Sequence, residues 1–326
     1  MPKISVVIPA YNAAKTIKET IQSVLNQTFT DLELIIINDG SQDATLEIVE
    51  RIPDPRIRLF SYPNAGPTVS RNRGILHAVG DYISFIDADD LWTPDKLESQ
   101  FNALQTNPQA AVAYSWTNSI DERGKLLRRG FYVQLNGDVY KTLLVINFLE
   151  NGSNPLIRRT ALVEMGGFEE SLTHGEDWDM WLRLASSYDF VAVPSPQVLY
   201  RISPGSASFN IFKQEEGCLI MIERAFTQVP ESLQNLKRLT LANLYKYLTS
   251  KALEGIPSRA NSLAAARFIG LALRNDPSLL GTRVLGKVLF KIALTLMLPS
   301  QQTQRLLTKF NRIFNTTSLL GYLKFS

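Results

Sequence analysis

Three aspartates lie within four residues in the stretch Asp87-Ala88-Asp89-Asp90, a spacing that could hold a metal ion. They follow residues 82–86, a short run of apolar, β-branched and aromatic side chains that predicts a strand buried on both faces of a parallel sheet. Ligands of open α/β sheets bind beyond the carboxyl ends of the strands, where these carboxylates would lie. Like charges so close together repel one another, and a hard divalent cation would relieve that repulsion.

The acidic stretch also has a purely structural interpretation. Thr93-Pro94-Asp95 has the form of a helix N-cap with proline at the first helical position, so the run could be a turn that caps the next helix. Asp90, the last of the three acids, is the residue for which capping is the main alternative to metal binding. The choice between the two interpretations depends on the rest of the chain.

Strands and helices are expected to alternate around this stretch. Apolar runs predict strands at residues 4–8, 34–37, 57–62 and 82–86. Helices are expected between them, on the apolar residues Ile17, Ile21, Val24, Leu25, Leu46 and Val49 and across residues 70–74. This order predicts an α/β fold, a mostly parallel central sheet with helices on both faces.

The first strand ends in Pro9-Ala10-Tyr11-Asn12, which argues against two common nucleotide sites. A dinucleotide-binding fold would carry GxGxxG at this turn, and a sugar nucleotidyltransferase would carry a triphosphate loop rich in Gly, Lys and Arg. Neither pattern is present. The aromatic ring of Tyr11 and the amide of Asn12 are better suited to stacking on a base or hydrogen-bonding to it.

The composition is typical of a soluble globular protein, with 326 residues of which 45% are hydrophobic and 20% charged. A single cysteine, Cys218, excludes an intramolecular disulfide and suits a reducing compartment. The two histidines, His77 and His174, are too few for a zinc site of the Cys/His type.

We expect neither a signal peptide, because Met1 leads directly into a strand, nor a spanning helix, because no run of about 18 apolar residues occurs. These features predict a cytoplasmic protein.

The charge is unevenly distributed along the chain. Residues 257–326 carry ten Lys or Arg against the single acid Asp276, whereas residues 1–256 carry 24 basic and 30 acidic residues. The C-terminal region is expected to be helical over residues 209–229, 233–253, 258–274 and 279–298, with prolines between the helices. The chain therefore divides into a domain at 1–225 and a basic helical region at 226–326.

Two segments of this region look amphipathic. Lys287 and Lys291 interrupt the apolar run of the last helix. In the next segment Arg305, Lys309 and Arg312 lie beside an apolar face, which consists of Leu306, Leu307, Phe310, Ile313 and Phe314. Basic amphipathic helices of this kind lie on anionic membranes. For this chain they predict an association with the inner face of the plasma membrane. The alternative is that the helices pack in a bundle. Nucleic-acid binding has no recognition motif to support it.

Five motifs in order give the chain a family resemblance. They are Val7-Ile8-Pro9-Ala10-Tyr11-Asn12, Asn38-Asp39-Gly40-Ser41-Gln42-Asp43, Ser70-Arg71-Asn72-Arg73-Gly74, Asp87-Ala88-Asp89-Asp90 and Glu176-Asp177-Trp178. Over about residues 3–205 the chain resembles the family 2 glycosyltransferases, which have a GT-A fold. The resemblance implies a nucleotide-sugar donor, a divalent metal (Mg²⁺ or Mn²⁺) and inversion at the anomeric carbon.

The resemblance also implies roles on the donor side. Asp89 would bind the metal, and Asp87, next to the small Ala88, would lie near the ribose or sugar of the donor. Asp39 would recognise a uracil or thymine ring; the alternative is a turn-forming residue. Donor contacts are also expected from Pro9, Tyr11 and Asn12 in the first turn and from Arg71. For Arg71 taken as an isolated residue, the alternative is a surface ion pair.

On the acceptor side, Asp177 is implied as the general base, with Glu176 as its helper. Acids at a helix N-terminus that favour the helix dipole are the alternative. Trp178 and Trp181 could stack on an acceptor sugar or pack in the core. Many members of the family place a histidine after the segment that here reads Val198-Leu199-Tyr200-Arg201-Ile202, but this chain has Ser203. His174 is a possible substitute, although a surface position is expected for it, and His77 is expected to be structural.

The sequence therefore predicts an inverting glycosyltransferase that uses a UDP- or dTDP-type donor and a glycan or lipid-linked acceptor in cell-surface polysaccharide synthesis. Two alternatives stay open, a membrane-associated nucleotide-sugar-binding protein without turnover and a sugar nucleotidyltransferase.

Overall fold

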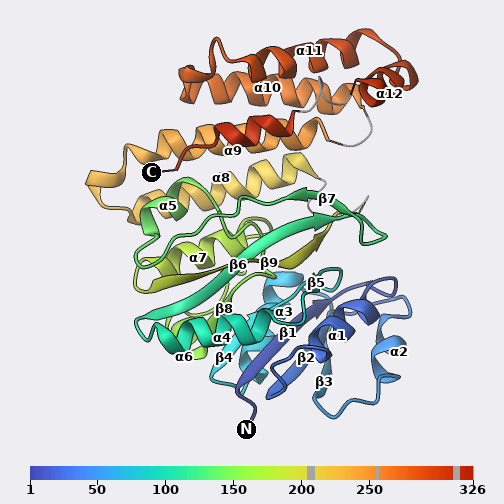
Figure 1. The fold of residues 1–326 in the computed structure, drawn as a ribbon, viewed down its shortest axis with the longest axis vertical. Helices are drawn as coiled ribbons and strands as arrows, with labels where there is room; N and C mark the ends of the chain where they lie inside the picture. The colour runs from blue at the N-terminus through green and yellow to red at the C-terminus, as the bar shows by residue number, and fades with distance from the viewer. Residues whose placement is uncertain (204–209, 255–256, 311–315, 326) are drawn as a thin grey trace. The chain divides into compact units, whose positions relative to one another are not determined.

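The computed structural model describes residues 1–203, 210–254, 257–310 and 316–325. Two compact units make up the chain (Figure 1). The first comprises Met1–Leu143 and Asn147–Ser206, and the second comprises Leu144–Ile146 and Ala207–Ser326. The boundary expected at residue 225 is wrong, because residue 225 lies inside a helix of the second unit, α8 (Ile211–Gln228).

The first unit is built on a mixed sheet that has nine strands within the described residues. They are β1 (Ile4–Ala10), β2 (Leu32–Asn38), β3 (Ile57–Ser61), β4 (Tyr82–Phe85), β5 (Leu91–Trp92), β6 (Ala110–Ile120), β7 (Leu126–Arg129), β8 (Leu156–Arg158) and β9 (Asp189–Arg201). The strand order is β3-β2-β1-β4-β8-β6-β9-β5, and β7 pairs with β6 at the side. The four strands expected from sequence are parallel neighbours, whereas β8 pairs antiparallel with β4.

Helices cover both faces of the sheet, as the βα alternation predicts. The helices in the first part of the chain are α1 (Ile17–Leu25), α2 (Thr45–Glu50), α3 (Pro67–His77), α4 (Lys96–Thr106), α5 (Tyr140–Val145), α6 (Arg159–Glu164) and α7 (Glu176–Ala185). Successive side chains of a strand point to opposite faces. In β1, Val6 joins the apolar core beneath α1, and Val7 points to the other face, against Gly74 of α3.

Gly74 shows how closely α3 approaches the sheet. A Cβ atom at this position would lie 2.2 Å from Cγ1 of Val7, far inside van der Waals contact. The absence of a side chain at Gly74 therefore lets α3 lie directly on β1. This contact sets the position of the buried side chains of α3, such as Arg71, at the end of the sheet.

The second unit consists of helices α8, α9 (Leu236–Ala252), α10 (Arg259–Asn275), α11 (Arg283–Met297) and α12 (Ser300–Lys309), with 3₁₀ turns at Glu231–Leu233, Pro277–Leu279 and Thr317–Tyr322. Helix α9 contacts both α8 and α10, and α11 packs on α10 (Figure 1). The helical expectation for this region is thus confirmed. Ile313, Phe314 and Arg312 of the expected amphipathic face lie outside the described residues. Among the helices that the structure describes, none is long and apolar enough to cross a membrane.

Candidate active site

The carboxyl ends of β1 and β4 lie side by side, because the two strands are parallel and Val7 pairs with Phe85. This register brings the turn at residues 9–12 and the three aspartates to the same edge of the sheet, as the sequence predicts. The aspartates form a tight turn in which the N–H of Asp90 donates to the carbonyl of Asp87 (3.0 Å). The N–H of Asp87 donates to the hydroxyl of Ser153 (3.0 Å), which ties this turn to the segment that precedes β8.

Arg71 connects the two parts of the candidate site. Its guanidinium donates to Oδ1 of Asp87 (2.6 Å) and to Oε1 of Glu176 (2.8 Å), residues that lie 16 and 105 positions away in sequence. The Arg71 side chain is 5% exposed, so the surface ion pair considered for it is wrong. Burial alone would lower its pKa, but the two carboxylates outweigh burial and raise it. A permanently charged arginine therefore fixes Asp87 relative to the start of α7.

Helix α7 presents Glu176 and Asp177 in its first turn, directly after Gly175 in the left-handed conformation (φ 78°). Its other face is apolar and buried, and it includes Trp178 and Trp181. The indole N–H of Trp178 donates to the carbonyl of Leu143 (2.7 Å). Because both tryptophans are enclosed, core packing is confirmed for them, and neither presents a free face to a sugar.

Asp177 and Asp89 both have raised pKa values. Burial and the neighbouring Glu176 raise the pKa of Asp177 to about 7, although Arg71 opposes the rise. Oδ1 of Asp177 accepts the backbone N–H of Trp178 (2.6 Å), which leaves Oδ2 as the oxygen that can take up a proton. Burial and the charge of Asp87 raise the pKa of Asp89 to about 6. The site thus contains more negative charge than Arg71 neutralises, and an added cation would be stabilised there.

Asp90 has a different environment from its two neighbours. It is fully buried, its carboxylate accepts from the Ser153 hydroxyl (2.6 Å) and from the N–H of Arg201 (2.9 Å), and burial raises its pKa well above the ordinary value. The capping role considered for it is wrong. Helix α4 begins at Lys96, two residues later than the Thr93-Pro94 signal predicts, and its N-terminal flanking residue is Asp95. Asp90 instead fastens the turn to β9.

Asp39 lies at the end of β2, and its carboxylate holds the loop before α3. Oδ1 accepts from the N–H of Ala65 (3.0 Å) and from Arg73 (3.2 Å), while Oδ2 accepts from the N–H of Gly66 (2.8 Å). The side chain is 3% exposed. These bonds give Asp39 a structural role in shaping the loop, and contact with a base stays a prediction.

The first turn offers a more accessible surface. Tyr11 is 51% exposed, and Asn12 adopts a positive φ of 49°. The N–H of Asn12 donates to the hydroxyl of Ser41 (3.1 Å) and its side-chain oxygen accepts from the N–H of Gln42 (2.8 Å), so the turns after β1 and β2 support each other. Pro9 and Ala88 contribute mainly packing, since Pro9 is half-buried in β1 and Ala88 belongs to the apolar core.

The two histidines differ in their surroundings. The ring of His77 stacks on Phe60 (3.7 Å between centroids) and hydrogen-bonds to the hydroxyl of Tyr62 (2.7 Å), which confirms a structural role. His174 approaches the hydroxyl of Thr173 (3.5 Å). The residues after Ser203, up to residue 209, lie outside the described part of the chain.

A metal ion fits this site if most of its ligands come from the donor. Within the described residues, no group of three or more His, Cys, Asp or Glu side chains is arranged to hold one. Asp87 already binds Arg71 through one oxygen, so Asp89 is the side chain best placed as a ligand. A ligand set of one carboxylate, phosphate oxygens and water suits Mg²⁺ or Mn²⁺.

Sequence reasoning missed Ser153 and Arg201, which support the aspartate turn, and Glu150, which lies three residues before Ser153 in the chain. Ser153 joins Asp87 to Asp90, and Arg201 donates to the carbonyl of Asp89 (2.8 Å) and to Glu19 (2.8 Å). Glu150 is strained, with a φ of 71°; its carboxylate accepts the N–H of Phe131 (3.2 Å), and burial raises its pKa to about 7. The turn-forming run before β8 is the signal that could have drawn attention to this segment.

Comparison with known proteins agrees with this geometry. The sequence model of the family described as "Glycosyltransferase like family 2" matches residues 5–252. An uncharacterized glycosyltransferase of Rickettsia felis is 33% identical over 208 residues, which is 64% of this chain and 34% of that protein. Chondroitin synthase of Escherichia coli is 33% identical over 238 residues, 72% of this chain and 33% of that protein. The chain spans about one third of the length of these relatives.

Solved structures share the fold at low sequence identity. TarS of S. aureus in complex with UDP-GlcNAc has a TM-score of 0.55 and 17% identity, and the match covers 84% of this chain and 89% of that chain. The mannosyltransferase PcManGT from Pyrobaculum calidifontis, in complex with GDP-Man and Mn²⁺, has a TM-score of 0.57 and 19% identity, with coverage of 98% and 87%. These matches confirm the expected GT-A fold.

Proposed function

The chain belongs to glycosyltransferase family 2, and on this premise we propose that it transfers a sugar from a UDP- or dTDP-type donor to a hydroxyl group of a glycan or lipid-linked acceptor, with inversion, in cell-surface polysaccharide synthesis. One observation carries the proposal. Arg71 holds Asp87, at the end of β4, and Glu176, at the start of α7, in one buried cluster. This cluster brings the donor-side aspartates close to Asp177.

Asp177 is the general base in this proposal. The acceptor hydroxyl gives its proton to Oδ2 of Asp177, and the oxygen attacks the anomeric carbon of the donor sugar. The bond from that carbon to the phosphate oxygen breaks, and its electron pair leaves with the nucleoside diphosphate. A pKa of about 7 suits this task, because a base works best when its pKa is near the operating pH. Attack opposite the leaving group inverts the anomeric centre.

Arg71 and Glu176 position the base. The guanidinium lies between Asp87 and Glu176, so the donor side and the acceptor side cannot move apart without breaking a buried ion pair. Asp89 would hold the metal, which when bound would stabilise the negative charge that develops on the leaving diphosphate. Tyr11 and Asn12, which are exposed on the turn after β1, would contact the base or ribose.

Relatives and structural neighbours support the proposed substrates. Two of the solved structures are complexes with UDP-GlcNAc and with GDP-Man and Mn²⁺, so nucleotide-sugars are the ligands of neighbours with this fold. The E. coli relative, named a chondroitin synthase, supports a role in polysaccharide synthesis.

Thermal shift with a panel of UDP-, dTDP- and GDP-sugars, each with and without Mn²⁺, tests the donor assignment. We expect stabilisation by one UDP- or dTDP-sugar that is larger with Mn²⁺. The Asp89→Asn variant should lose the Mn²⁺-dependent part of the shift and keep its fold, because the Asp89 side chain is half-buried and forms no ion pair with another residue that the structure describes. If no donor shifts the melting temperature, the donor assignment is wrong. If Asp89→Asn behaves like the wild type, the metal assignment is wrong.

A further inference from the structure

Helix α11 exposes an apolar face. Leu289 is 48% exposed, Phe290 56% and Met297 81%, and Ala293 between them is also exposed. The opposite face, with Val284, Val288 and Ile292, is buried in the helical unit. On an α-helix, positions 286, 289, 290, 293 and 297 form one continuous strip, so these apolar side chains are neighbours on the surface.

Basic residues border this strip on one side. Arg283 and Lys287 are separated by about one helical turn and follow its edge. Helix α12, which contacts α11, carries the exposed Arg305 and Lys309. Among the described residues, no carboxylate forms an ion pair with any of these four side chains. Lys291, the next residue along the edge, is more buried and feels the charge of Glu254, so we assign it no part in the surface.

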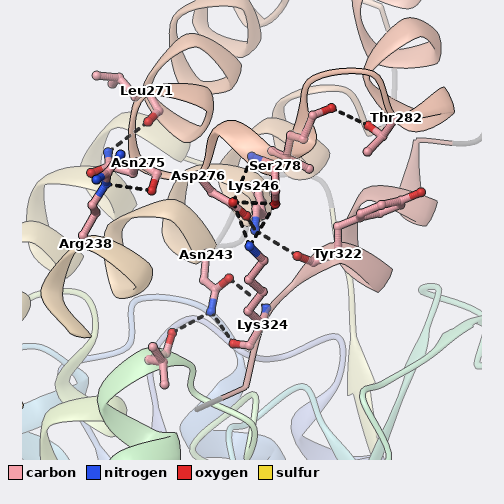
Figure 2. A network of polar contacts seen from close by, with 12 residues as sticks. Arg238, Asn243, Lys246, Leu271, Asn275, Asp276, Ser278, Thr282, Tyr322 and Lys324 are labelled. Atoms are coloured by element: carbon pink, nitrogen blue, oxygen red, sulfur yellow. Dashed lines mark hydrogen bonds and ion pairs between the residues drawn. The ribbon is translucent and has the colours of Figure 1, made fainter. Parts of the chain in front are cut away.

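The one acid of residues 257–326 cannot balance these charges, because it serves as an internal counter-ion (Figure 2). Asp276 accepts from the buried Lys246 (2.8 Å) through Oδ2 and from Lys324 (2.8 Å) through Oδ1. Hydrogen bonds and ion pairs lower its pKa below the ordinary value although burial opposes this. Asn243 binds the backbone of Lys324 on both sides, with its amide donating to the carbonyl (2.8 Å) and its oxygen accepting the N–H (3.1 Å).

The same network shows that the end of the described chain is fixed in place. Lys246 also donates to the carbonyl of Tyr322 (2.8 Å), so the segment before the C-terminus is held against α9 and packs beside α11. Asp276 therefore does not offset the positive charge of Arg283, Lys287, Arg305 and Lys309. Residues 207–326 hold 16 Lys or Arg against six acids in the sequence.

We propose that the strip of Gly286, Leu289, Phe290, Ala293 and Met297 on α11, with Arg283 and Lys287 at its edge, docks on an anionic lipid bilayer. An apolar strip bordered by cations matches the two layers of a membrane surface, acyl chains beneath and anionic headgroups above. The helix would lie in the plane of the interface, since no described helix can span a bilayer. Of the two segments that look amphipathic in the sequence, this surface lies on the first, which Lys287 and Lys291 interrupt, and the second, at residues 305–314, contributes no side chain to the strip.

Vesicle co-sedimentation of the full chain tests this docking without any need for activity. We expect binding to phosphatidylcholine vesicles that contain about 30% phosphatidylglycerol, weak binding to pure phosphatidylcholine, and loss of binding as salt shortens the electrostatic range. The double variant Arg283→Gln/Lys287→Gln should bind about 25-fold more weakly, since each basic residue near an anionic surface contributes a factor of about five. The variant Leu289→Gln/Met297→Gln should lose about tenfold or more, because its side chains no longer enter the acyl region.

Matched controls distinguish docking through α11 from general effects of surface charge and surface hydrophobicity. Lys15→Gln/Lys18→Gln removes two exposed cations from the first unit, and Leu76→Gln replaces a leucine that is 84% exposed on α3. Both should bind vesicles like the wild type. Circular dichroism and melting temperature verify that every variant is folded.

Three results would overturn the proposal. The first is equal binding by the α11 variants and the wild type. The second is loss of binding when Leu126 and Leu127, exposed on β7, are changed to Gln while the α11 variants still bind. The third is concentration-dependent self-association that the α11 variants abolish in the absence of vesicles, which would make the strip a contact between copies of the chain.

Discussion

Replacement of Asp177 by asparagine should make the protein more stable and, at the same time, inactive. The site holds this carboxyl group in surroundings that favour its neutral form, since its pKa is raised from 3.8 to about 7 by burial and by Glu176. Asparagine is neutral at every pH, nearly equal in size, and its side-chain oxygen can still accept the N–H of Trp178. The variant therefore removes the unfavourable charge and leaves the hydrogen bond.

The expected gain follows from linkage between ionisation and folding. The difference between 3.8 and about 7 corresponds to an upper limit of about 4 kcal/mol at pH 8. Water screens part of this because the side chain is half-buried, so we expect about 2 kcal/mol. Because the pKa of Asp177 is higher in the folded state than in the unfolded state, the wild-type protein is most stable below the unfolded pKa of 3.8. It loses stability as the pH rises from there to the folded pKa of about 7. The gain of Asp177→Asn should thus be absent below about pH 4, grow between pH 4 and 7, and stay constant above.

Thermal melting from pH 4 to pH 8, with wild type and variant side by side, measures this gain. For a unit of this size, about 2 kcal/mol corresponds to a rise of about 4–8 °C in melting temperature. Glu176→Gln is the matched control, since it removes an ion pair with Arg71 and should lower the melting temperature instead. If Asp177→Asn were less stable than the wild type at pH 8, or if its gain did not depend on pH, our account of the environment of Asp177 would be wrong.

Two further predictions concern the elements that position the site. Arg71→Gln should destabilise the first unit by about 3 kcal/mol, measured by chemical unfolding, because it leaves Asp87 and Glu176 without their shared cation; no loss would mean that the ion pairs have no net effect. Gly74→Ala should cost about 1–3 kcal/mol, because the new Cβ meets Val7 at 2.2 Å. Gly270→Ala, also within a helix but with open space around it, should be neutral or stabilising by up to about 1 kcal/mol, and equal effects at both glycines would contradict the packing argument.

The first half of the fold could be predicted from sequence because its signals are local. Runs such as residues 34–37 are apolar enough to be buried on both faces, and β2 is indeed buried along its whole length. The later strands were not predicted. Strand β9 has a mixed burial pattern and carries two prolines, and it is held by its pairing with β6 and β5, which lie far away in the chain. No local sequence pattern predicts pairings between strands that lie so far apart in the chain.

The candidate site was predicted residue by residue but not as a cluster. The positions of Asp87, Asp89 and Asp177 follow from motifs, whereas the bridge through Arg71 depends on how α3 and α7 pack and could not be read from spacing. Asp90 illustrates the same limit. Its sequence context suggested a helix cap, but burial beside Ser153 and Arg201 makes it the anchor of the turn.

The most direct test of the proposed active site is a single-turnover measurement with the donor that the thermal-shift panel identifies. Donor binding and release of nucleoside diphosphate would be followed in the presence of acceptor for the wild type and for Asp177→Asn. We predict that the variant binds the donor with unchanged affinity and releases nucleoside diphosphate about 10²–10⁴-fold more slowly, because only the base is missing. Release at the wild-type rate by Asp177→Asn would contradict the assignment of Asp177 and, with it, the proposed catalytic cluster.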